Sequence, residues 1–433
     1  MDLPVRPVQG LQASLRVPGD KALSHRAAIL LALSRNGGRI RGFSTAQDAA
    51  STLAALEALG AGVRREGEEV VLAGGGREVL RAPSAALDCA NSGSTMRMLA
   101  GVLAGCPFEV ILDGDASLRR RPMERVAGPL RRMGAELSCE GEGGRPPLRL
   151  RGGALKGIVF SPPVPSAQVK TAVLLAGLAA EGTTTVEEAV STRDHTEGML
   201  RFLGVPVEQA GRTVSVRGPA SWTGRDLEIP GDPSSAAFFL CAAAGRPGSR
   251  IQVLGVCLNP GRIGFVEVLR RMGARVEVRQ TGLAGGEPVG ELSVEGRPLK
   301  GTFIPAAEVP SLIDELPALA VAASQALGET RVAGAGELRV KESDRIAALA
   351  AGLGAMGARI GPTEDGFVVL GPSRLRGAVV DSAGDHRIAM ALAMAGTMAE
   401  GETLVRGAEC IAVSLPEFQG ILMQMSRETR PGW

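Results

Sequence analysis

Five segments of the sequence place a lysine or an arginine in or near the first turn of an expected apolar helix. Each runs from a polar or glycine-rich turn into small apolar residues. The start of a helix already carries free N–H groups and partial positive charge, so a cation there is unfavourable unless an anion lies beside it. The repeated pattern therefore indicates sites for anionic ligands. The cations are Lys21, Arg26, Arg97, Lys170, Lys341, Arg345 and Arg387.

In the segment "RVKESDRIAAL", Lys341 and Arg345 are four residues apart, so we expect them to be neighbours in the first turn of a helix. The segment "PGDPSSAAFFLCAAA" (230–244) has the same turn and helix without a cation, so the fold itself does not require one. Taken singly, each segment is explained about equally well by an anion site and by ordinary structure, in which Ser, Asn or Asp caps the helix and the arginine reaches out to water. The five together favour function.

Two further segments add groups that could bind anions or move protons. The loop at 113–126 gathers four arginines, and Pro122 would fix Arg121 so that its guanidinium could clamp a phosphate or carboxylate; a solvated basic face is the alternative. Glu315, next to Asp314, is expected to act as a first-turn acid that satisfies the helix dipole. Glu342 lies among cations, so it stays ionised until an anionic substrate neutralises them, which makes it a candidate for proton transfer.

The composition bounds the class of protein. The 433 residues are too many for one hydrophobic core, so two domains are expected. A net charge of +2, 3% aromatic residues and no tyrosine argue against a nucleic-acid surface. Six scattered cysteines, none at zinc spacing, indicate reduced thiols. With no signal peptide and no apolar run long enough to span a bilayer, we expect a cytoplasmic protein without a metal, a cofactor, a nucleic-acid partner or a membrane partner.

A short pattern recurs along the chain: Leu, two residues, Leu or Met, then Gly. Its glycines are at positions 60, 134, 204, 273 and 357, and each copy predicts a helix that ends at a glycine cap and leads into a strand. The spacing predicts about six α/β modules. A coarser repeat, "VPGDKALSHRAAILLAL" against "IPGDPSSAAFFLCAAA", places the domain crossings near residues 18 and 230. We therefore predict a first lobe at 20–228 and a second lobe formed by 1–19 and 229–433.

Eight motifs, in order along essentially the whole chain, resemble those of the 5-enolpyruvylshikimate-3-phosphate synthase (EPSP synthase) family. They are "PGDKALSHRA", "NSGSTMR", "RRRPM", "SAQVKTA", "STRDHTE", "LIDELP", "VKESDR" and "GDHRIAM". The resemblance implies an α/β fold of two similar domains, each of three βαβαββ units, known as the enolpyruvyl transferase fold or inverse α/β barrel. It also implies an active site in the interdomain cleft and a monomeric enzyme.

The resemblance further implies two small-molecule substrates, phosphoenolpyruvate and shikimate-3-phosphate, and the residues that hold them. Asn91 would shape the phosphoenolpyruvate loop, and Ala22 and Ala167 belong to the substrate-binding set. Shikimate-3-phosphate would be held by Lys21, Arg26, Ser166, Gln168, Arg193, Asp314 and Lys341, and phosphoenolpyruvate by Gly93, Arg121, Arg345 and Arg387, with Gln168 close to both.

The implied chemistry is addition followed by elimination. Carbon 3 of phosphoenolpyruvate is protonated, the 5-hydroxyl of shikimate-3-phosphate attacks carbon 2, and the tetrahedral intermediate loses phosphate. Asp314, Glu342 and Lys21 are the candidates for the proton transfers, and which residue performs which step stays open. Inhibition by glyphosate is expected beside Gly93.

The sequence differs from the common pattern of the family at three positions, and two alternative functions compete with this interpretation. Ala22 stands where the family often has Ser, Val413 stands in a C-terminal motif where some members carry Lys, and Arg193 belongs to one branch of the family. The nearest rival is the sister enolpyruvyl transferase that acts on a UDP-amino sugar, but its loop cysteine is missing, because no Cys lies between Pro107 and Leu137. The other rival is a protein that binds RNA ends.

Overall fold

The repeated glycine pattern ends five helices at a left-handed residue. In the computed structural model, which describes residues 1–428, Gly60, Gly134, Gly204, Gly273 and Gly357 have φ between 77° and 116°. Only glycine adopts this conformation without strain, so each helix stops there and a strand follows, as predicted. The helices are α2 (Gln47–Ala58), α4 (Glu124–Met133), α6 (His195–Phe202), α8 (Gly264–Arg271) and α10 (Arg345–Ala355), and the strands are β4 (Val63–Glu66), β8 (Glu136–Gly141), β12 (Val207–Ala210), β16 (Arg275–Ala284) and β20 (Arg359–Pro362).

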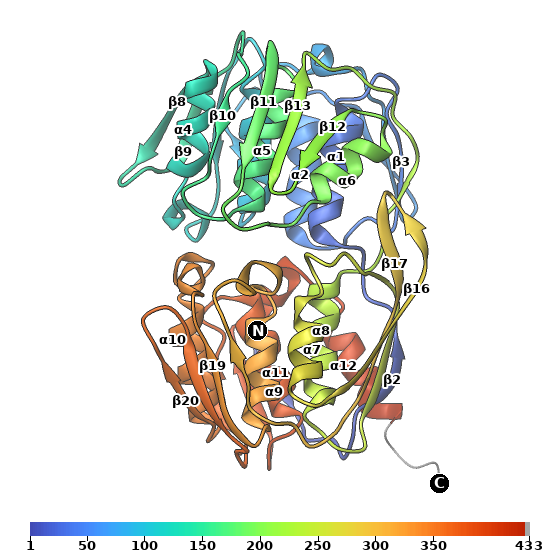
Figure 1. Ribbon diagram of the computed structural model, residues 1–433, viewed down its shortest axis with the longest axis vertical. Helices are drawn as coiled ribbons and strands as arrows, with labels where there is room; N and C mark the ends of the chain where they lie inside the picture. Colours follow the sequence, from blue (N-terminus) through green and yellow to red (C-terminus); the bar gives the residue numbers. More distant parts are fainter. Residues whose placement is uncertain (429–433) are drawn as a thin grey trace. The chain divides into compact units, whose positions relative to one another are not determined.

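The described chain divides into two compact units (Figure 1). Unit 2 comprises Gly19–Ile229 and the short stretch Ala284–Glu287. Unit 1 comprises Met1–Pro18, Pro230–Leu283 and the chain from Pro288 onward. The backbone therefore passes between the units four times, after residues 18, 229, 283 and 287.

Unit 2 contains three four-stranded sheets of one design. Each has a parallel pair at one edge, followed by two antiparallel pairs. Their orders are β14-β3-β5-β4, β6-β7-β9-β8 and β10-β11-β13-β12. The remaining strands are β3 (Gly38–Arg41), β5 (Glu69–Leu72), β6 (Leu87–Asp88), β7 (Glu109–Asp113), β9 (Arg145–Arg151), β10 (Val159–Phe160), β11 (Gly182–Glu187), β13 (Thr213–Gly218) and β14 (Leu227–Glu228).

Unit 1 also contains three sheets, with the orders β16-β17-β15-β2, β18-β19-β21-β20 and β1-β23-β22. The two N-terminal strands complete two of them, β2 pairing parallel with β15 and β1 antiparallel with β23. The strands not yet given are β1 (Leu3–Val5), β2 (Gln12–Leu15), β15 (Arg250–Cys257), β17 (Glu287–Glu295), β18 (Phe303–Ile304), β19 (Gly328–Val332), β21 (Phe367–Gly371), β22 (Val379–Asp381) and β23 (Thr403–Arg406).

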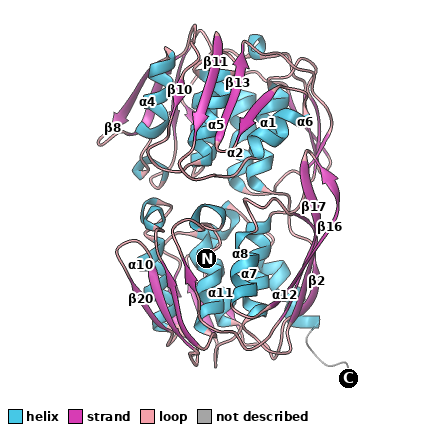
Figure 2. Ribbon diagram, viewed as in Figure 1, coloured by secondary structure: helices cyan, strands magenta, loops and turns pink. Residues whose placement is uncertain are grey.

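Three central helices form the core of each unit. In unit 2 they are α1 (Lys21–Ala32), α3 (Gly93–Leu103) and α5 (Ala167–Gly177); in unit 1 they are α7 (Pro233–Ala244), α9 (Leu316–Ser324) and α11 (His386–Gly396). Every residue of α7, α9 and α11 is buried, as expected for helices that are apolar on all sides. Figure 2 shows strands packed around the helices within each unit. Four of the five segments with cations are the starts of central helices, namely α1, α3, α5 and α11, and the fifth leads into α10.

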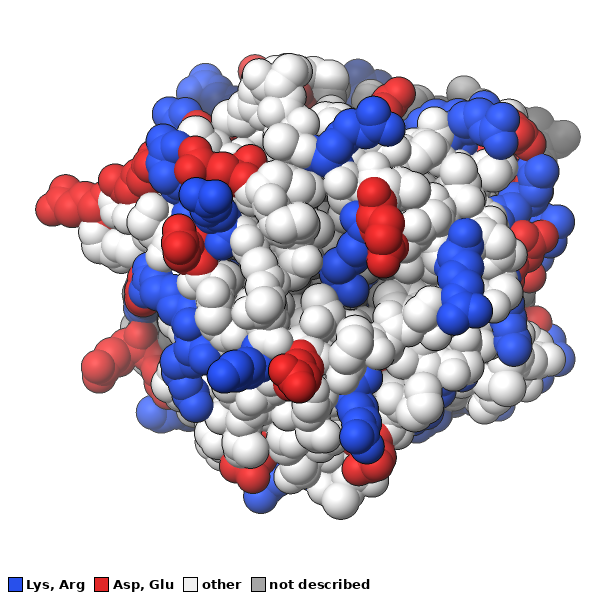
Figure 3. Space-filling view, turned by 90° about the horizontal axis from the view of Figure 1, so that it is seen from above, with Lys and Arg blue, Asp and Glu red and all other residues white. Residues whose placement is uncertain are grey.

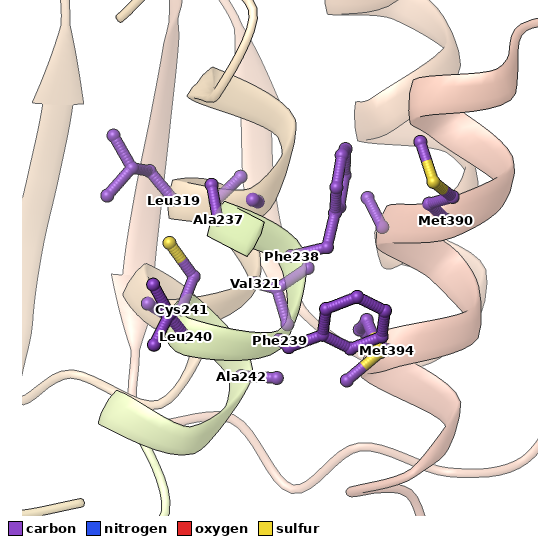
Figure 4. Close-up of a cluster of buried hydrophobic side chains, with 14 of the residues drawn as sticks. Ala237, Phe238, Phe239, Leu240, Cys241, Ala242, Leu319, Val321, Met390 and Met394 are labelled. Atoms are coloured by element: carbon purple, nitrogen blue, oxygen red, sulfur yellow. The ribbon is translucent and has the colours of Figure 1, made fainter. Parts of the chain in front are cut away.

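The unit 1 core is filled by side chains that meet between α7, α9 and α11 (Figure 4). Phe238 and Phe239 of α7 lie beside Met390 and Met394 of α11. The ring of Phe239 stacks on Phe418 at the start of α12 (Phe418–Glu428), with 5.7 Å between centroids. Such dense apolar packing holds the starts of the helices in fixed positions. Five short 3-10 helices connect the elements: η1 (Arg77–Val79), η2 (Leu118–Arg120), η3 (Val309–Ser311), η4 (Gly336–Val340) and η5 (Ala408–Val413).

The outer surface mixes charges of both signs. On the face drawn in Figure 3, lysines and arginines are interspersed with aspartates and glutamates and leave uncharged areas between them. A surface that binds nucleic acid would instead gather basic residues into a stripe or patch. Within residues 1–428, no helix is both long and apolar enough to cross a membrane.

Candidate active site

The start of α3 is built around Gly93. The Ser92 side chain caps the helix and accepts a hydrogen bond from the backbone N–H of Thr95 at 3.1 Å. Gly93 is the first helical residue, and a Cβ at this position would lie 2.5 Å from Nη1 of Arg97 and 3.3 Å from Nη1 of Arg121. Two guanidinium groups thus lie against a helix N-terminus with no side chain between them. This arrangement suits an anionic ligand.

Neutral amide groups hold both guanidinium groups. Arg97 donates to Oε1 of Gln168 at 2.6 Å, and Gln168 in turn donates to the hydroxyl of Ser94 at 2.8 Å. Arg121 donates to Oδ1 of Asn91 at 2.7 Å. The expectation that Asn91 shapes this loop agrees with that contact.

The four arginines of the basic loop at 113–126 differ in how far they are exposed. Arg121 is buried, whereas Arg119 and Arg120 are exposed. Arg119 donates to Asp113 at 2.9 Å and holds the pKa of that carboxyl below its ordinary value. The solvated basic face therefore describes Arg119 and Arg120, whereas Arg125 is partly buried and Arg121 lies against Gly93.

At the start of α1, Lys21 is neutralised within unit 2. Its Nζ lies 2.7 Å from Oδ2 of Asp48, a residue of α2, and both side chains are largely buried. Asp20 caps the helix by accepting from the N–H of Leu23. Ala22, at the position where a hydroxyl was expected, contributes its carbonyl oxygen to Arg26 at 2.8 Å.

Arg26 is also tied to two threonines. Its Nε donates to the hydroxyl of Thr196 at 2.8 Å and its Nη2 to that of Thr171 at 2.9 Å. The two threonines lie on α6 and α5, so Arg26 connects three helix starts. At α5 itself, Ser166 is the cap and Ala167 the first helical residue, and the Ser166 hydroxyl accepts from the N–H of Val169 at 3.4 Å.

Lys170 contradicts the inference that a cation at a helix start marks a site for an anionic ligand. Its Nζ lies 2.8 Å from Glu188 and 2.7 Å from Glu197, and its side chain is only 1% exposed. Two carboxylates of the protein, and not a ligand, neutralise this lysine. The same correction applies to Arg345 in unit 1.

Arg345 is buried among three carboxylates. Its Nε donates to Asp385 at 2.8 Å, its Nη2 to Glu342, and its Nη1 to Asp314 at 3.4 Å. Burial alone would lower the pKa of Arg345, but the negative charges of Asp385, Glu342 and Asp314 together raise it above its ordinary value. The prediction that a substrate anion alone makes this cation tolerable is wrong, because the acids of unit 1 already balance it.

Lys341 does not share a helical turn with Arg345. It follows the 3-10 helix η4 with φ −83° and ψ −146°, and α10 begins only at Arg345. The cause is Asp344, whose carboxylate caps α10 by accepting from the N–H of Ala347 at 3.0 Å. The expected repulsion between neighbouring cations on one helix is therefore wrong for this pair.

Arg387 and Asp314 lie together in unit 1. Arg387 donates through Nη1 to the carbonyl oxygen of Asp314 at 2.9 Å, and its Nε lies 3.6 Å from the carboxylate. Asp385 caps α11 and accepts from the N–H of Arg387 while it also binds Arg345. One unit therefore gathers the predicted residues around Arg345: Asp314 and Glu342 contact it together with Asp385, and Arg387 lies beside Asp314.

The helix start at 230–244 contains no cation of its own, but an arginine from another part of the chain lies against it. Arg262, from the loop before α8, donates through Nη2 to Asp232 and to the hydroxyl of Ser234, both at 3.0 Å. The Ser234 hydroxyl donates to the buried carboxylate of Glu315. The segment itself has no cation, but the inference that the fold requires none at this helix start is wrong, because Arg262 supplies it. The expectation that Glu315 is an ordinary first-turn acid is also wrong, since Glu315 precedes α9 as its cap residue.

Sequence reasoning missed four acids that balance the helix-start cations: Asp48, Asp385, Glu188 and Glu197. Asp385 carried a signal, because an Asp in the "GDHR" turn is a natural cap. Asp48 and Glu188 carried none, since their partners lie 27 and 18 residues away on other elements. Arg193 lies, partly buried, in the turn before α6. Within residues 1–428, no group of three or more His, Cys, Asp or Glu is arranged to hold a metal ion.

The polar clusters can bind anions and exchange protons. In unit 2, guanidinium groups lie at helix N-termini beside neutral amides and hydroxyls, and the ammonium group of Lys21 lies beside the carboxylate of Asp48. In unit 1, carboxylates lie against guanidinium groups, so the proton affinity of each carboxylate depends on what else the cations bind.

Comparison with known proteins agrees with this chemistry. The sequence model of the family described as EPSP synthase (3-phosphoshikimate 1-carboxyvinyltransferase) matches residues 5–422. A 3-phosphoshikimate 1-carboxyvinyltransferase of Pelotomaculum thermopropionicum is 50% identical over 429 residues, which cover 98% of this chain and 99% of that protein.

Solved structures confirm the predicted fold. An EPSP synthase from Acinetobacter baumannii superposes with a TM-score of 0.86 at 42% identity and covers 98% of each chain. An enolpyruvyl transferase from Streptomyces tendae has the same fold, with a TM-score of 0.78 at 21% identity over 98% of this chain and 96% of its own. From the full-length match, and from the motifs that supply the polar side chains of the site in both units, we conclude that the chain belongs to the EPSP synthase (3-phosphoshikimate 1-carboxyvinyltransferase) family.

Proposed function

We propose that this protein transfers the enolpyruvyl group of phosphoenolpyruvate to the 5-hydroxyl of shikimate-3-phosphate and releases inorganic phosphate and EPSP. The observation that carries the proposal is the gathering of buried cations at the helix starts that bear the family's motifs. Both substrates are polyanions, so cations on rigid helix starts would bind them without reorganisation.

In unit 2, we assign phosphoenolpyruvate to the start of α3. Its phosphate and carboxylate would meet Arg121 and the free N–H groups at Gly93, with Gln168 close by. Shikimate-3-phosphate would meet the starts of α1 and α5. The residues proposed for it there are Lys21, Ala22, Arg26, Ser166, Ala167, Gln168 and Arg193, and Asn91 would hold Arg121 in place.

In unit 1, Lys341 and Asp314 are proposed to bind shikimate-3-phosphate, and Arg345 and Arg387 to bind phosphoenolpyruvate. We propose that residues of both units act on one pair of substrates during turnover. The active site is predicted to lie between two lobes. The first lobe would span residues 20–228, and the second would comprise residues 1–19 and 229–433. The site and the bounds both stay predictions.

The proton transfers are assigned to Asp314, Glu342 and Lys21. One of them gives a proton to carbon 3 of phosphoenolpyruvate, and another takes the proton of the attacking 5-hydroxyl. In the second stage a proton leaves carbon 3 as phosphate departs, so the sum over both stages consumes no proton. Glu342 suits such an exchange because its contact with Arg345 is weakened when Arg345 binds a substrate anion.

One coupled assay tests the proposal. The purified protein is mixed with phosphoenolpyruvate and shikimate-3-phosphate, and inorganic phosphate is followed with time. Release of phosphate only when both substrates are present supports the proposal. Release with a UDP-amino sugar in place of shikimate-3-phosphate would instead assign the chain to the sister transferase, and binding of RNA ends without phosphate release would assign it to neither.

Two properties expected from the sequence stay predictions: the monomeric state and the cytoplasmic location. Light scattering from the purified protein measures the first. None of the six cysteines, all of which lie within residues 1–428, forms a disulfide, which supports a reducing compartment.

A further inference from the structure

A buried ion cluster in unit 2 has no part in the reaction proposed above. We define the lysine cluster as Lys170, Glu188, Thr192 and Glu197. Lys170 lies between the two carboxylates at 2.8 Å and 2.7 Å, and its side chain and that of Glu197 are at most 1% exposed. Burial raises the pKa of Glu197, although the nearby charge of Lys170 opposes the rise. Buried ions are costly, so their presence calls for a function.

The cluster joins two helix starts that the substrate proposal uses. Lys170 and Thr171 are successive residues of α5, and Thr196 and Glu197 are successive residues of α6. Lys170 binds Glu197, and the hydroxyls of Thr171 and Thr196 lie 2.6 Å apart. Arg26 of α1 donates to both of these threonines. Two adjacent residues on each helix therefore fix α5 against α6.

The cluster also closes the turn that leads into α6. One oxygen of Glu188 accepts from Lys170, and the other accepts from the hydroxyl of Thr192. The backbone N–H of Glu188 donates to the carbonyl oxygen of Arg212 at 3.0 Å, which ties the other side of the turn to the loop before β13. Arg193 follows Thr192 directly. The contacts of Thr192 thus fix the backbone of Arg193 on its N-terminal side, and those of Thr196 and Glu197 fix it on its C-terminal side.

The choice of lysine fits this role. Only five of the 48 basic residues of the chain are lysines. A compact ammonium can place its donors between two carboxylates in a small volume, whereas a planar guanidinium needs more space.

We propose that Lys170 is a positioning residue for shikimate-3-phosphate: through Glu188 and Thr192 it fixes the turn 188–194, so that Arg193 is already placed to receive the anionic substrate. The inference rests on the proposed function. A preorganised turn lowers the cost of binding one substrate and leaves the chemical step unchanged.

The test uses Thr192→Val, which removes the hydroxyl and keeps the shape of the side chain. We expect the KM for shikimate-3-phosphate to rise roughly tenfold, because a hydrogen bond to a charged group is lost. The kcat and the KM for phosphoenolpyruvate should stay near the wild-type values, and Thr192→Ser should restore the low KM. Thr185→Val is the matched control, since its hydroxyl lies 2.9 Å from that of Ser215 between strands, away from the turn. An unchanged KM for shikimate-3-phosphate in Thr192→Val overturns the proposal.

Lys170 itself is tested by Lys170→Met and by Glu188→Gln, because the first leaves two buried carboxylates without their cation and can fail to fold. Glu188→Gln keeps an oxygen that accepts from Thr192 and loses only the charge. In every variant that folds, we expect the KM for shikimate-3-phosphate to rise while the KM for phosphoenolpyruvate does not. A parallel rise of both Michaelis constants indicates a merely structural role and contradicts the proposal.

A second readout does not depend on activity. Amide hydrogen exchange in the substrate-free protein should become faster in residues 188–194 of Thr192→Val and stay unchanged in the Thr185→Val control. Unchanged exchange in the turn overturns the positioning role. If the wild-type protein releases no phosphate from its two substrates, the proposed function fails, and the exchange experiment still decides whether Lys170 orders the turn.

Discussion

Arg345 shows how a single buried cation can be both stable and responsive. Three carboxylates balance it in the substrate-free protein: Asp314, Glu342 and Asp385. An anion that binds Arg345 must share it with these acids. The carboxylate that yields its contact gains proton affinity, because a nearby positive charge then stabilises its ionised form less strongly. Glu342 is the acid on the same short segment as Arg345, so we expect it to respond first.

Glu342→Gln tests this at the residue scale. The amide keeps the shape and a hydrogen-bond acceptor for Arg345 but cannot exchange a proton. We expect kcat to fall by roughly 10²–10⁴-fold with the fold intact, as measured by phosphate release and circular dichroism. Glu308→Gln, which removes an exposed partner of Arg271, is the control and should keep its turnover. Near-normal turnover in Glu342→Gln would remove this residue from proton transfer.

Gly93→Ala tests the space at the start of α3. The added methyl would lie 2.5 Å from the end of the Arg97 side chain, and that flexible side chain can move, so we expect the protein to fold. A phosphoenolpyruvate analogue such as glyphosate, if it occupies this space, should then bind more weakly by about tenfold or more. Inhibition curves for both forms measure the effect. Equal inhibition of the two forms contradicts the placement of phosphoenolpyruvate beside Gly93.

His25 should make stability depend on pH. It is fully buried beside Lys21 and Arg26, and burial first, with those two charges next, lowers its pKa well below the ordinary 6.5. Below about pH 6.5 the unfolded chain therefore binds a proton on His25 that the folded chain does not, so stability is lost as the pH falls. Urea unfolding at pH 7.5 and pH 5.5 should show a smaller loss in His25→Gln than in the wild type. An identical loss in both proteins would show that other groups carry the dependence.

At the scale of elements, each central helix start is stabilised by side chains that come from elsewhere in its unit. The start of α1 uses Lys21 with Asp48 of α2, whereas the start of α7 uses Asp232 with Arg262 from the loop before α8. The two helices resemble each other in sequence, but the cation comes from a different element in each. A conserved arrangement of charges at a helix start thus does not require a conserved position in the sequence.

Arg262→Met should expose how much the start of α7 depends on its borrowed cation. Removing one partner of a buried pair costs on the order of 3–5 kcal/mol, because Asp232 and the buried Glu315 network then lie without the compensating charge. Arg6→Met is the matched control, since its pair with Glu402 is exposed and should contribute at most ~1 kcal/mol. Urea unfolding of both variants measures the difference. Equal losses of stability would contradict the importance of the Arg262 contact.

The sequence predicted what depends on neighbouring residues. Each glycine of the repeat ends its helix, because a left-handed residue there has no alternative to glycine. The prediction that Lys341 lies in the first turn of a helix is wrong, because Asp344 caps α10 and the helix begins only at Arg345. The sequence also could not find Asp48 or Glu188, because those acids reach their cations through tertiary packing, which no local spacing records.

For the molecule as a whole, the four crossings of the backbone distinguish the two units. Unit 2 is almost one continuous stretch, Gly19–Ile229, and adds only Ala284–Glu287 from the turn between β16 and β17. That turn supplies Glu287, whose carboxylate lies 2.7 Å from Nδ1 of His195 in a buried pair. Unit 1, in contrast, is assembled from three separated stretches.

A protein consisting of residues 19–229 should therefore fold alone. We expect a cooperative urea transition followed by circular dichroism, at a lower urea concentration than for Glu287→Gln in the full chain, because the fragment loses both the carboxylate and the packing of the turn. Glu287→Gln in the full chain, compared with the wild type, isolates the effect of the charge. A fragment without a cooperative transition would show that residues 19–229 need more of the chain than Ala284–Glu287 in order to fold.

The N-terminal strands β1 and β2 leave the ribosome first, but their partners β23 and β15 are translated after all of residues 19–229. Leu3 pairs with Val405, 402 residues downstream. At a synthesis rate of about 5–20 residues per second, β1 waits on the order of 20–80 s for its partner, while unit 2 has time to fold. Both strands are short, which limits the edge that they offer to other nascent chains. Among the strands of the two units, β1 and β2 are therefore the ones on which a chaperone has the longest time to act.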